Sequence, residues 1–325
     1  MAIDGCESVN KIDCISRAKY IREKLSTLID VEKHLHKIIP KMAIFQVGND
    51  FASNIYIKNK IKVAEKIGVV VELKKFDDNF TEDSLIEEII SVNNNDEYCG
   101  MIVQLPLPKH INCVNVLRTI VPNKDLDGLN PINSGLLHYS KYVPYCVDEV
   151  INQSLKYDFI LGETKPFIPC TPLGCLDILQ QEEKRYVGNK KKGGEVGNLS
   201  ISSSNAVVIG NSNLVGKPMA RLLIQSGATT TTIHSRSRNF DIFLQNADII
   251  VSATGAGQVI KNIKKNAIVI DVAIRKNQNG DICGDIDYEE VVQNNRITPV
   301  PGGIGPMTIS CLMLTYYLSL KFANC

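Results

Sequence analysis

The sequence lacks the features by which a protein binds a membrane or a nucleic acid. No apolar run approaches the roughly 20 residues that a membrane-spanning helix needs. Basic residues are not in surplus either, because 36 Lys and Arg residues are balanced by 35 Asp and Glu residues, for a formal net charge of +1. Binding to phosphate backbones or to anionic lipids depends on such a surplus. We therefore expect neither nucleic acid nor a membrane as the main partner.

The ten cysteines also lack the spacing of a metal or redox motif. They are scattered from Cys6 to Cys325, and no C-x-x-C occurs among them. Reduced, mostly buried thiols of this kind are typical of a reducing compartment. The first residues, MAIDGCESVNKIDC, include acids and no apolar segment, so they do not resemble a signal peptide. The sequence thus predicts a cytoplasmic protein without a metal site.

Along the chain, strand-like and helix-like segments alternate, as in an α/β protein. Short apolar runs at 42–48, 69–76 and 99–107 read as strands, and helix-like segments at 54–68 and 81–94 lie between them. Strands separated by helices of this length are typical of βαβ units and a parallel sheet.

A second series of the same kind begins at residue 206. A strand at 206–210 is followed by a helix at 217–227, with Pro218 in its first turn and Gly227 at its end. Three more β-branched runs follow, ATTTTIHS, ADIIVSATG and NAIVIDVAI. The chain has room for about two domains, so we expect two parallel-sheet α/β domains with a cleft between them.

The predicted domain boundaries follow from these two series of strands and helices. The first domain spans residues 1–150 and is completed by the C-terminal segment 299–325, while residues 151–298 form a Rossmann-type dinucleotide-binding domain. Residues 186–205 are rich in Lys, Gly and Ser and have no hydrophobic period. We expect them to form a flexible surface loop.

The turn in VVIGNSNLVGKPMARLL, residues 207–223, is the first candidate for a ligand site. A strand there runs through a glycine turn into a helix, but the spacing departs from G-x-G-x-x-G. Gly210 and Gly216 allow close backbone approach, the Ser212 hydroxyl can donate to a phosphate oxygen, and a helix N-terminus attracts anions. A plain strand-to-helix turn is the alternative.

The end of the next strand bears on which dinucleotide would bind. NAD-binding domains usually carry an acid there for the ribose 2′-OH, whereas this chain reads HSRSRN, with no acid before Asp241. The hydroxyl of Ser235 and the guanidinium groups of Arg236 and Arg238 suit a 2′-phosphate. The segment favours NADP over NAD, with solvated surface arginines as the alternative.

Several polar residues of the first domain are candidates for chemistry. Tyr56 and Lys60 share one helical face, and Gln104 follows a strand at the edge where open α/β sheets bind ligands. A lysine beside an aromatic ring in a cleft can shuttle protons near neutrality. Asp127 lies in the turn-rich PNKDLDGLNPINSG, and TPVPGGIGPMT (298–308) is too long for a simple turn. Surface neighbours and an Asx turn are the alternatives.

Taken together, these segments resemble the methylenetetrahydrofolate dehydrogenase/methenyltetrahydrofolate cyclohydrolase family. The matching segments cover almost the whole chain in order: YIKNKIKVAEKIGV, GMIVQLPLP, PNKDLDGLNPINSG, PCTPLG, VVIGNSNLVGKPMA, ADIIVSATG, IVIDVAI and TPVPGGIGPMT. The family's own phosphate turn has the form G-x-S-x-x-V-G. The resemblance implies a folate-binding catalytic domain, an NADP-binding domain and two activities, oxidation of 5,10-methylenetetrahydrofolate and hydrolysis of the methenyl product to 10-formyltetrahydrofolate.

The resemblance also implies roles for individual residues. Lys60 matches the catalytic lysine of the hydrolytic step, Gln104 the glutamine that orients it, and Asp127 the residue that hydrogen-bonds the pterin. Tyr56 matches the tyrosine that stacks on the folate. The other implied folate-binding positions are Val103, Leu105, Pro301, Gly302, Gly303, Ile304 and Gly305. The implied cofactor-binding positions are Gly210, Asn211, Ser212, Ser235, Arg236 and Ile274.

Two departures from the family pattern keep alternatives open. Asn211 stands where the family commonly has Arg, and Ala273 where Gly is usual. One alternative is therefore an NAD-dependent methylenetetrahydrofolate dehydrogenase with weak or absent cyclohydrolase activity. A catalytically silent folate- or nucleotide-binding protein is another, and it would require the loss of a catalytic side chain. The resemblance further implies a homodimer formed through the dinucleotide domains.

Overall fold

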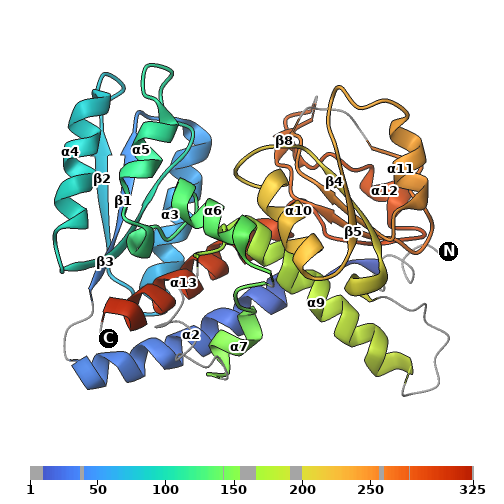
Figure 1. Ribbon diagram of the computed structural model, residues 1–325, viewed down its shortest axis with the longest axis horizontal. Helices are drawn as coiled ribbons and strands as arrows, with labels where there is room; N and C mark the ends of the chain where they lie inside the picture. The colour runs from blue at the N-terminus through green and yellow to red at the C-terminus, as the bar shows by residue number, and fades with distance from the viewer. Residues whose placement is uncertain are drawn as a thin grey trace. The chain divides into compact units, whose positions relative to one another are not determined.

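The computed structural model describes residues 10–36, 40–141, 143–153, 166–190, 200–255, 260–277 and 279–323. The chain divides into two compact units, each described here by itself (Figure 1). Unit 1 lies within Met1–Ala18, Lys141–Val143 and Thr171–Thr308, and unit 2 within Lys19–Ser140, Pro144–Cys170 and Ile309–Cys325. In the described part of the chain, no helix combines the length and apolarity needed to cross a membrane.

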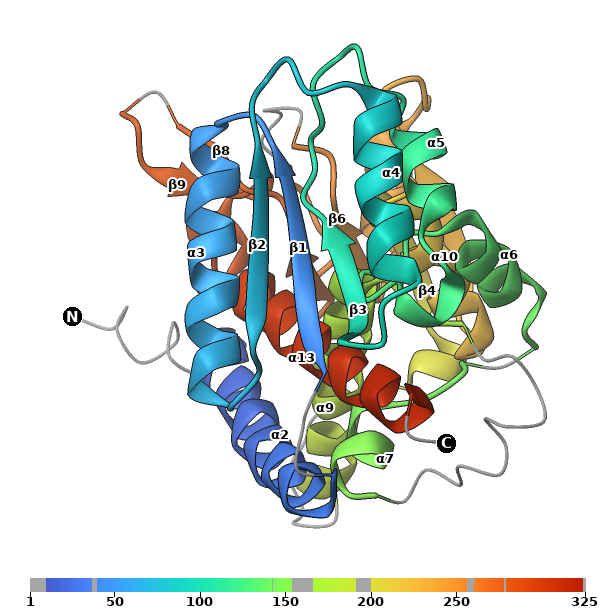
Figure 2. The same cartoon turned by 90° about the vertical axis from the view of Figure 1, so that its left-hand side faces the viewer.

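Unit 2 is built on a three-stranded parallel sheet of order β2–β1–β3 (Figure 2). Its first elements are β1 (Lys41–Val47), α3 (Phe51–Lys66), β2 (Val71–Phe76), α4 (Glu82–Asn93) and β3 (Tyr98–Val103). The predicted alternation is thus confirmed. The third strand ends earlier than the predicted residue 107, because Pro106 and Pro108 have no N–H group to donate to a ladder.

Helices cover both faces of this sheet. On one face Ala43, Phe45 and Met101 pack in a core with residues of α4 and of α5 (Cys113–Thr119). Helix α3 has its buried residues, Ile57 and Lys60 among them, along a single side. The other elements of unit 2 are η1 (Pro122–Lys124), α6 (Pro131–Tyr139), α7 (Val147–Ile151) and most of α2 (Cys14–His36) and α13 (Ile304–Ala323).

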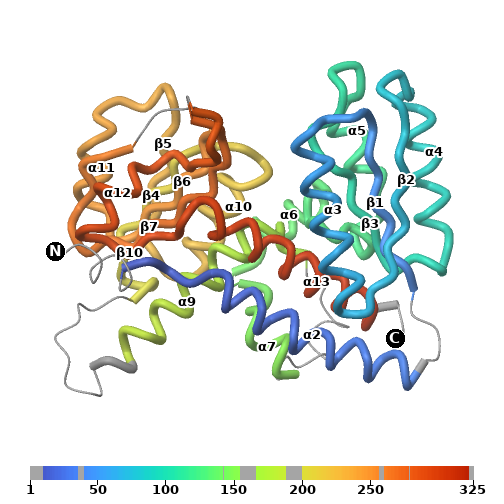
Figure 3. Tube along the Cα trace, turned by 180° about the vertical axis from the view of Figure 1, so that it is seen from behind, coloured from blue at the N-terminus to red at the C-terminus, as the bar shows by residue number. Residues whose placement is uncertain are grey.

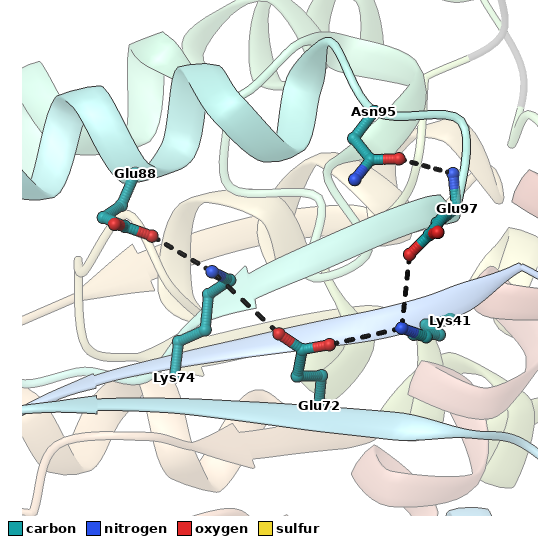
Figure 4. Close-up of polar contacts among 6 residues, drawn as sticks. All are labelled: Lys41, Glu72, Lys74, Glu88, Asn95 and Glu97. Atoms are coloured by element: carbon teal, nitrogen blue, oxygen red, sulfur yellow. Dashed lines mark hydrogen bonds and ion pairs between the residues drawn. The ribbon is translucent and has the colours of Figure 1, made fainter.

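One edge of the sheet carries a network of surface ion pairs (Figure 4). Glu72 on β2 lies between Lys41 of β1, at 3.5 Å, and Lys74, at 4.0 Å. Lys74 also pairs with Glu88 of α4 at 3.0 Å, and Lys41 with Glu97 at 3.3 Å. Isolated pairs with exposed side chains contribute little, but this network ties two strands, a helix and the turn before β3 together.

Unit 1 contains a five-stranded parallel sheet of order β10–β7–β6–β4–β5 (Figure 3). Its strands are β4 (Asn205–Ile209), β5 (Thr229–Ile233), β6 (Ile249–Ser252), β7 (Ile268–Asp271) and β10 (Arg296–Ile297). The chain places β5 on one side of β4 and the later strands on the other. This reversal makes the end of β4 the topological switch point of a Rossmann-type domain, as predicted.

The helices of unit 1 lie on both sides of its sheet. Helix α10 (Gly216–Gln225) packs on β4 and β5, and α11 (Phe240–Asn246) and α12 (Tyr288–Val291) contribute to the core on the other side (Figure 1). Short elements complete the unit: η2 (Ile201–Ser203) and the antiparallel pair β8 (Arg275–Lys276) and β9 (Ile282–Cys283).

The predicted surface loop at 186–205 is wrong at both of its ends. Helix α9 (Cys170–Lys190) runs through residues 186–190, and η2 and the first residue of β4 occupy 201–205. A hydrogen bond of 2.9 Å from the backbone N of Ile201 to the Glu183 side-chain Oε1 attaches the second end to the helix. The rest of that prediction, residues 191–199, lies outside the described residues.

The two units divide the chain differently from the predicted domains. Residues 10–18 belong to unit 1, where Ile12 N donates to Ile297 O at 2.9 Å. Residues 299–308 also belong to unit 1, where the hydroxyls of Thr171 and Thr308 lie 3.1 Å apart. Residues 166–170 belong instead to unit 2, because Ile168 N donates to the Tyr145 hydroxyl at 3.0 Å.

Candidate active site

Lys60 is a buried cation at the centre of the candidate site in unit 2. Helix α3 begins at a cap in which Asp50 accepts from Ser53 N at 2.7 Å, and it carries Lys60 three turns later with only 4% of its surface exposed. The Lys60 Nζ atom donates to Gln104 Oε1 at 3.2 Å and lies 5.1 Å from the centre of the Tyr56 ring. The structure thus brings together the three residues that the sequence grouped.

Gln104 is fixed in the orientation that presents its oxygen to the lysine. It directly follows β3, and its backbone N–H continues the ladder by donating to Phe45 O at 2.8 Å. Its side-chain Nε2 donates to Leu105 O at 2.7 Å, so Oε1 is the end that meets Lys60. The neighbouring Val103 side chain lies in the core between β3, α4 and α5, which leaves only its backbone for a ligand.

The two acids of the DLDG turn have different environments. Asp125 is buried, and its Oδ2 accepts from Asn130 N at 2.7 Å and from Asn133 Nδ2 at 2.9 Å. Burial raises the pKa of Asp125 to about 6. Leu126 N donates to Met101 O at 3.1 Å, which attaches the turn to β3. Asp127 is only partly buried and is therefore the acid that a ligand can reach.

Cys170 is a buried thiol next to the DLDG turn. Burial raises the pKa of its thiol well above the ordinary value, and the charges of both Asp127 and Lys60 act on it. Its Sγ lies 3.3 Å from Leu126 O. The thiol therefore packs against the turn that carries Asp127.

The phosphate turn of unit 1 is too tight for side chains at its glycines. Gly210 has φ of +118°, and a Cβ there would lie 2.6 Å from Ala253 O. A Cβ on Gly216 would lie 2.2 Å from Gly210 O. The Ser212 Oγ accepts from Val215 N at 3.2 Å and from Gly216 N at 3.4 Å, so it caps the start of α10. Ser212 is exposed on this turn, and its donation to a phosphate stays a prediction.

The cationic end of β5 forms a second turn. Ser237 N donates to His234 O at 2.8 Å, and His234 N to Ser237 Oγ at 3.0 Å. This closed turn holds Ser235 and Arg236 between its ends, both exposed. Since β5 neighbours β4 in the sheet, these side chains lie at the same carboxyl edge as the phosphate turn.

The remaining predicted residues of unit 1 lie after β7, in the loop before α13 and in the first turn of α13. Ile274 follows β7 and is 61% exposed. In the segment 301–305, Gly302 has φ of +93° and a Cβ on Gly303 would lie 2.3 Å from Pro299 O. A Cβ on Gly305 would meet no heavy atom within 4 Å, so the backbone there is open. No group of three or more His, Cys, Asp or Glu in the described ranges is arranged to hold a metal.

Comparison with known proteins identifies the family of this chain. Residues 12–127 match the tetrahydrofolate dehydrogenase/cyclohydrolase catalytic domain, and residues 194–323 match the NAD(P)-binding domain of the same name. The chain belongs to the tetrahydrofolate dehydrogenase/cyclohydrolase family. The bifunctional protein FolD of Staphylococcus epidermidis is 38% identical over 307 residues, which is 94% of each chain.

Solved structures of the tetrahydrofolate dehydrogenase/cyclohydrolase family agree with this fold. The bifunctional FolD of Campylobacter jejuni has a TM-score of 0.81 at 33% identity, over 96% of this chain and 98% of that chain. The Trypanosoma brucei dehydrogenase-cyclohydrolase, complexed with NADP cofactor and inhibitor, has a TM-score of 0.78 at 29% identity, over 97% and 98%. The match to the catalytic domain spans Tyr56 to Asp127, and the other match spans every predicted cofactor residue.

Sequence reasoning missed several buried polar residues of this family member. Gln46 at the end of β1 donates to Asn54 Oδ1 at 2.7 Å. Asp271 and Asp285 are buried under the carboxyl edge of the sheet in unit 1. Asp271 ends an apolar strand, and Asp285 follows a glycine in CGDID. The signal for these residues in the sequence was a carboxylate that follows a buried strand or a glycine.

Proposed function

We infer that this chain is a bifunctional enzyme of one-carbon folate metabolism. It oxidises 5,10-methylenetetrahydrofolate to 5,10-methenyltetrahydrofolate with NADP, and it hydrolyses the methenyl product to 10-formyltetrahydrofolate. The observation that carries the proposal is the buried Lys60 ammonium on Gln104 Oε1 beside the Tyr56 ring, inside the catalytic-domain match. A proton shuttle of this kind is what the hydrolytic step requires.

In the hydrolytic step, Lys60 moves protons. Water attacks the amidinium carbon of the cationic methenyl substrate, forming a C–O bond, and the neutral amine of Lys60 takes a proton from that water. The hydroxyl group formed at this carbon then loses its proton as the bond from the carbon to one of its two nitrogens breaks, and that nitrogen receives a proton, which gives the formyl product.

The neighbours of Lys60 position the reactants. Gln104 accepts a hydrogen bond from Nζ and so directs the amine, while the Tyr56 ring offers a surface on which the pterin stacks. The Asp127 carboxylate accepts hydrogen bonds from the pterin. The backbone of Val103 and Leu105 lines the folate.

The dehydrogenase step depends mainly on alignment of two rings. NADP, held in unit 1, would supply the acceptor for the hydride that leaves the methylene bridge. The turn from Gly210 to Gly216 has the close backbone and the helix N-terminus that a pyrophosphate needs, and Asn211 and Ser212 are exposed on it. Ser235 and Arg236 supply a hydroxyl and a cation for the 2′-phosphate. Ile274, exposed after β7, contacts the nicotinamide end.

An absorbance assay of the purified chain tests the proposal. We expect methenyl product from 5,10-methylenetetrahydrofolate with NADP, cleared faster than its spontaneous hydrolysis. Turnover with NAD alone would assign the cofactor preference to Asn211 rather than to the arginines. Turnover with neither cofactor, and no acceleration of methenyl hydrolysis, would contradict the proposed function and favour a silent binding protein.

We also propose that the enzyme is a cytoplasmic homodimer. The described cysteines are all free thiols, as suits a reducing compartment. Sedimentation equilibrium would give twice the mass of the 36.0 kDa chain. A single-chain mass at micromolar concentration would contradict the dimer without affecting the activity.

A further inference from the structure

Two buried carboxylates lie below the carboxyl edge of the sheet in unit 1, outside the predicted site. Asp271 is the last residue of β7 and is 3% exposed, and Asp285, in the segment that follows β9, is fully buried. A buried carboxylate is costly unless donors surround it. The donors that surround these two side chains therefore show what the carboxylates hold in place.

Asp285 holds the loop that follows β6. Its Oδ2 accepts from Ser252 Oγ at 3.1 Å, from Thr254 N at 3.1 Å, from Thr254 Oγ1 at 2.8 Å and from Gly255 N at 3.1 Å. Its Oδ1 is buried and has no hydrogen-bond partner among the described residues. The side chain is thus committed through one oxygen to the loop 252–255.

That loop forms one wall of the phosphate turn. The Ala253 carbonyl oxygen is the atom that a Cβ on Gly210 would approach to 2.6 Å, and Ala253 N donates to Ile209 O at 2.8 Å. Because β4 and β6 are neighbours on either side of the switch point, a shift of loop 252–255 would move the backbone against which Gly210 turns.

Asp271 makes the equivalent connection to the loop that follows β7. Its Oδ1 accepts from Ala273 N at 3.1 Å, next to the predicted nicotinamide contact Ile274. Its Oδ2 accepts from Ile286 N at 2.9 Å, which fixes the backbone beside Asp285. A Cβ on Gly284 would lie 1.9 Å from Asp271 Oδ2, so only glycine fits there. Together the two carboxylates hold the loops that follow β6 and β7 in place.

We propose that Asp285 is a positioning residue for NADP, which acts by fixing loop 252–255 against the Gly210 turn. The inference rests on the proposed function of unit 1 and adds a residue to it. Asp285 touches neither hydride nor pyrophosphate in this role. It sets the backbone position that the pyrophosphate meets, so its loss weakens cofactor binding and leaves the chemistry of bound ligands largely intact.

The variant Asp285→Asn tests this role, because the amide keeps the shape but loses the charge that strengthens four hydrogen bonds. We expect KM and Kd for NADP to rise about tenfold, with kcat of the dehydrogenase changing less than about threefold. Methenyl hydrolysis, assayed without NADP, should keep its kcat/KM. Asp287→Asn is the matched control, since Asp287 caps α12 and pairs with Lys261 at 3.4 Å.

A second pair of variants covers the case in which Asp285→Asn does not fold. Thr254→Val removes the shortest donor to Asp285, and Thr254→Ser keeps it. NADP affinity should fall in the first and be restored in the second. A wild-type KM for NADP in Asp285→Asn, or a parallel loss of both activities, would overturn the proposal. An inactive wild-type enzyme would instead overturn the proposed function.

Discussion

Lys60 differs from the other lysines of helix α3 in being buried, and this difference predicts the effect of removing it. Lys58 and Lys62 are exposed, whereas Lys60 contacts Gln104. We expect Lys60→Met to lower the rate of methenyl hydrolysis at least about 100-fold, the usual contribution of a proton-transfer group. Hydride transfer, which needs ring alignment, should survive in part. Separate assays of the two steps measure both effects.

Lys62→Met is the matched control for this experiment. The same side chain is removed from the same helix, but from an exposed position, so both activities should remain close to those of the wild type. If Lys60→Met hydrolysed the methenyl substrate at the wild-type rate, the assigned proton shuttle would be wrong. If it lost both activities equally, the role of Lys60 would lie in binding the folate.

At the residue scale, the arginines after β5 are the predicted determinants of cofactor preference. Arg236 and Arg238 are exposed and unlike the acid that NAD-binding domains place there. We expect the double variant Arg236→Ala and Arg238→Ala to raise KM for NADP by at least about tenfold, since a charge-assisted contact to phosphate is worth more than one kcal/mol. KM for NAD should change much less. Equal changes for both cofactors would exclude these arginines from phosphate recognition.

At the scale of single elements, two glycines differ in whether a side chain would fit at their position. Gly216 begins α10 with Gly210 O only 2.2 Å from where a Cβ would be, while Gly135 in α6 has open space. We expect Gly135→Ala to stabilise the chain by about 0.5–1 kcal/mol, through helix propensity. Gly216→Ala should instead destabilise it by about 1–3 kcal/mol, the cost of overpacking, and weaken NADP binding. Thermal unfolding and NADP titration measure both.

Gly216→Ala is also informative if it fails to behave this way. A variant with wild-type stability and wild-type NADP affinity would mean that the turn relaxes freely, and the close approach of Gly210 and Gly216 would then have no functional weight. Gly135→Ala controls for the added methyl group, because it makes the same chemical change far from the phosphate turn in the sequence.

Elements with a clear hydrophobic period could be predicted from the sequence, and those without one could not. The strands β1, β4, β6 and β7 are short apolar runs with turn residues at their ends. Helix α9 was not predicted, and its last turns were interpreted as part of a Lys- and Gly-rich loop. Local composition there was overridden by the packing of the first part of the helix.

The site residues show the same division. Tyr56, Lys60 and Gln104 were grouped because helix spacing and strand ends place them, and the structure brings them into contact. Asp271 and Asp285 were missed, because partners such as Ile286 N and Thr254 N lie far along the chain from them. Such pairings depend on the fold and leave no periodic pattern.

At the scale of the whole molecule, buried carboxylates make stability depend on pH. Burial raises the pKa of Asp125 from 3.8 to about 6 in the folded chain, and that of Asp271 likewise to about 6. Between the unfolded and folded values, the folded chain binds more protons than the unfolded one. Each group therefore lowers the free energy of unfolding as pH rises from about 4 to about 6, and the loss persists above that.

The variant Asp125→Asn isolates one of these contributions. Asparagine does not titrate, and its amide oxygen can still accept from Asn130 N, so any cost of the changed hydrogen bonds is constant with pH. Relative to the wild type, the variant should gain up to about 3 kcal/mol of stability between pH 4 and pH 7.5, which corresponds to the shift in pKa.

Calorimetric Tm values of both proteins across this range measure the gain as a difference that grows with pH. Because Asp271 titrates in both proteins, its contribution cancels in the comparison. Asp96→Asn, at an exposed turn position, controls for the loss of one charge and should show a much smaller change. A difference between Asp125→Asn and the wild type that stayed constant from pH 4 to pH 7.5 would show that Asp125 is ionised in the folded chain throughout. Its two hydrogen bonds from Asn130 and Asn133 would then outweigh burial.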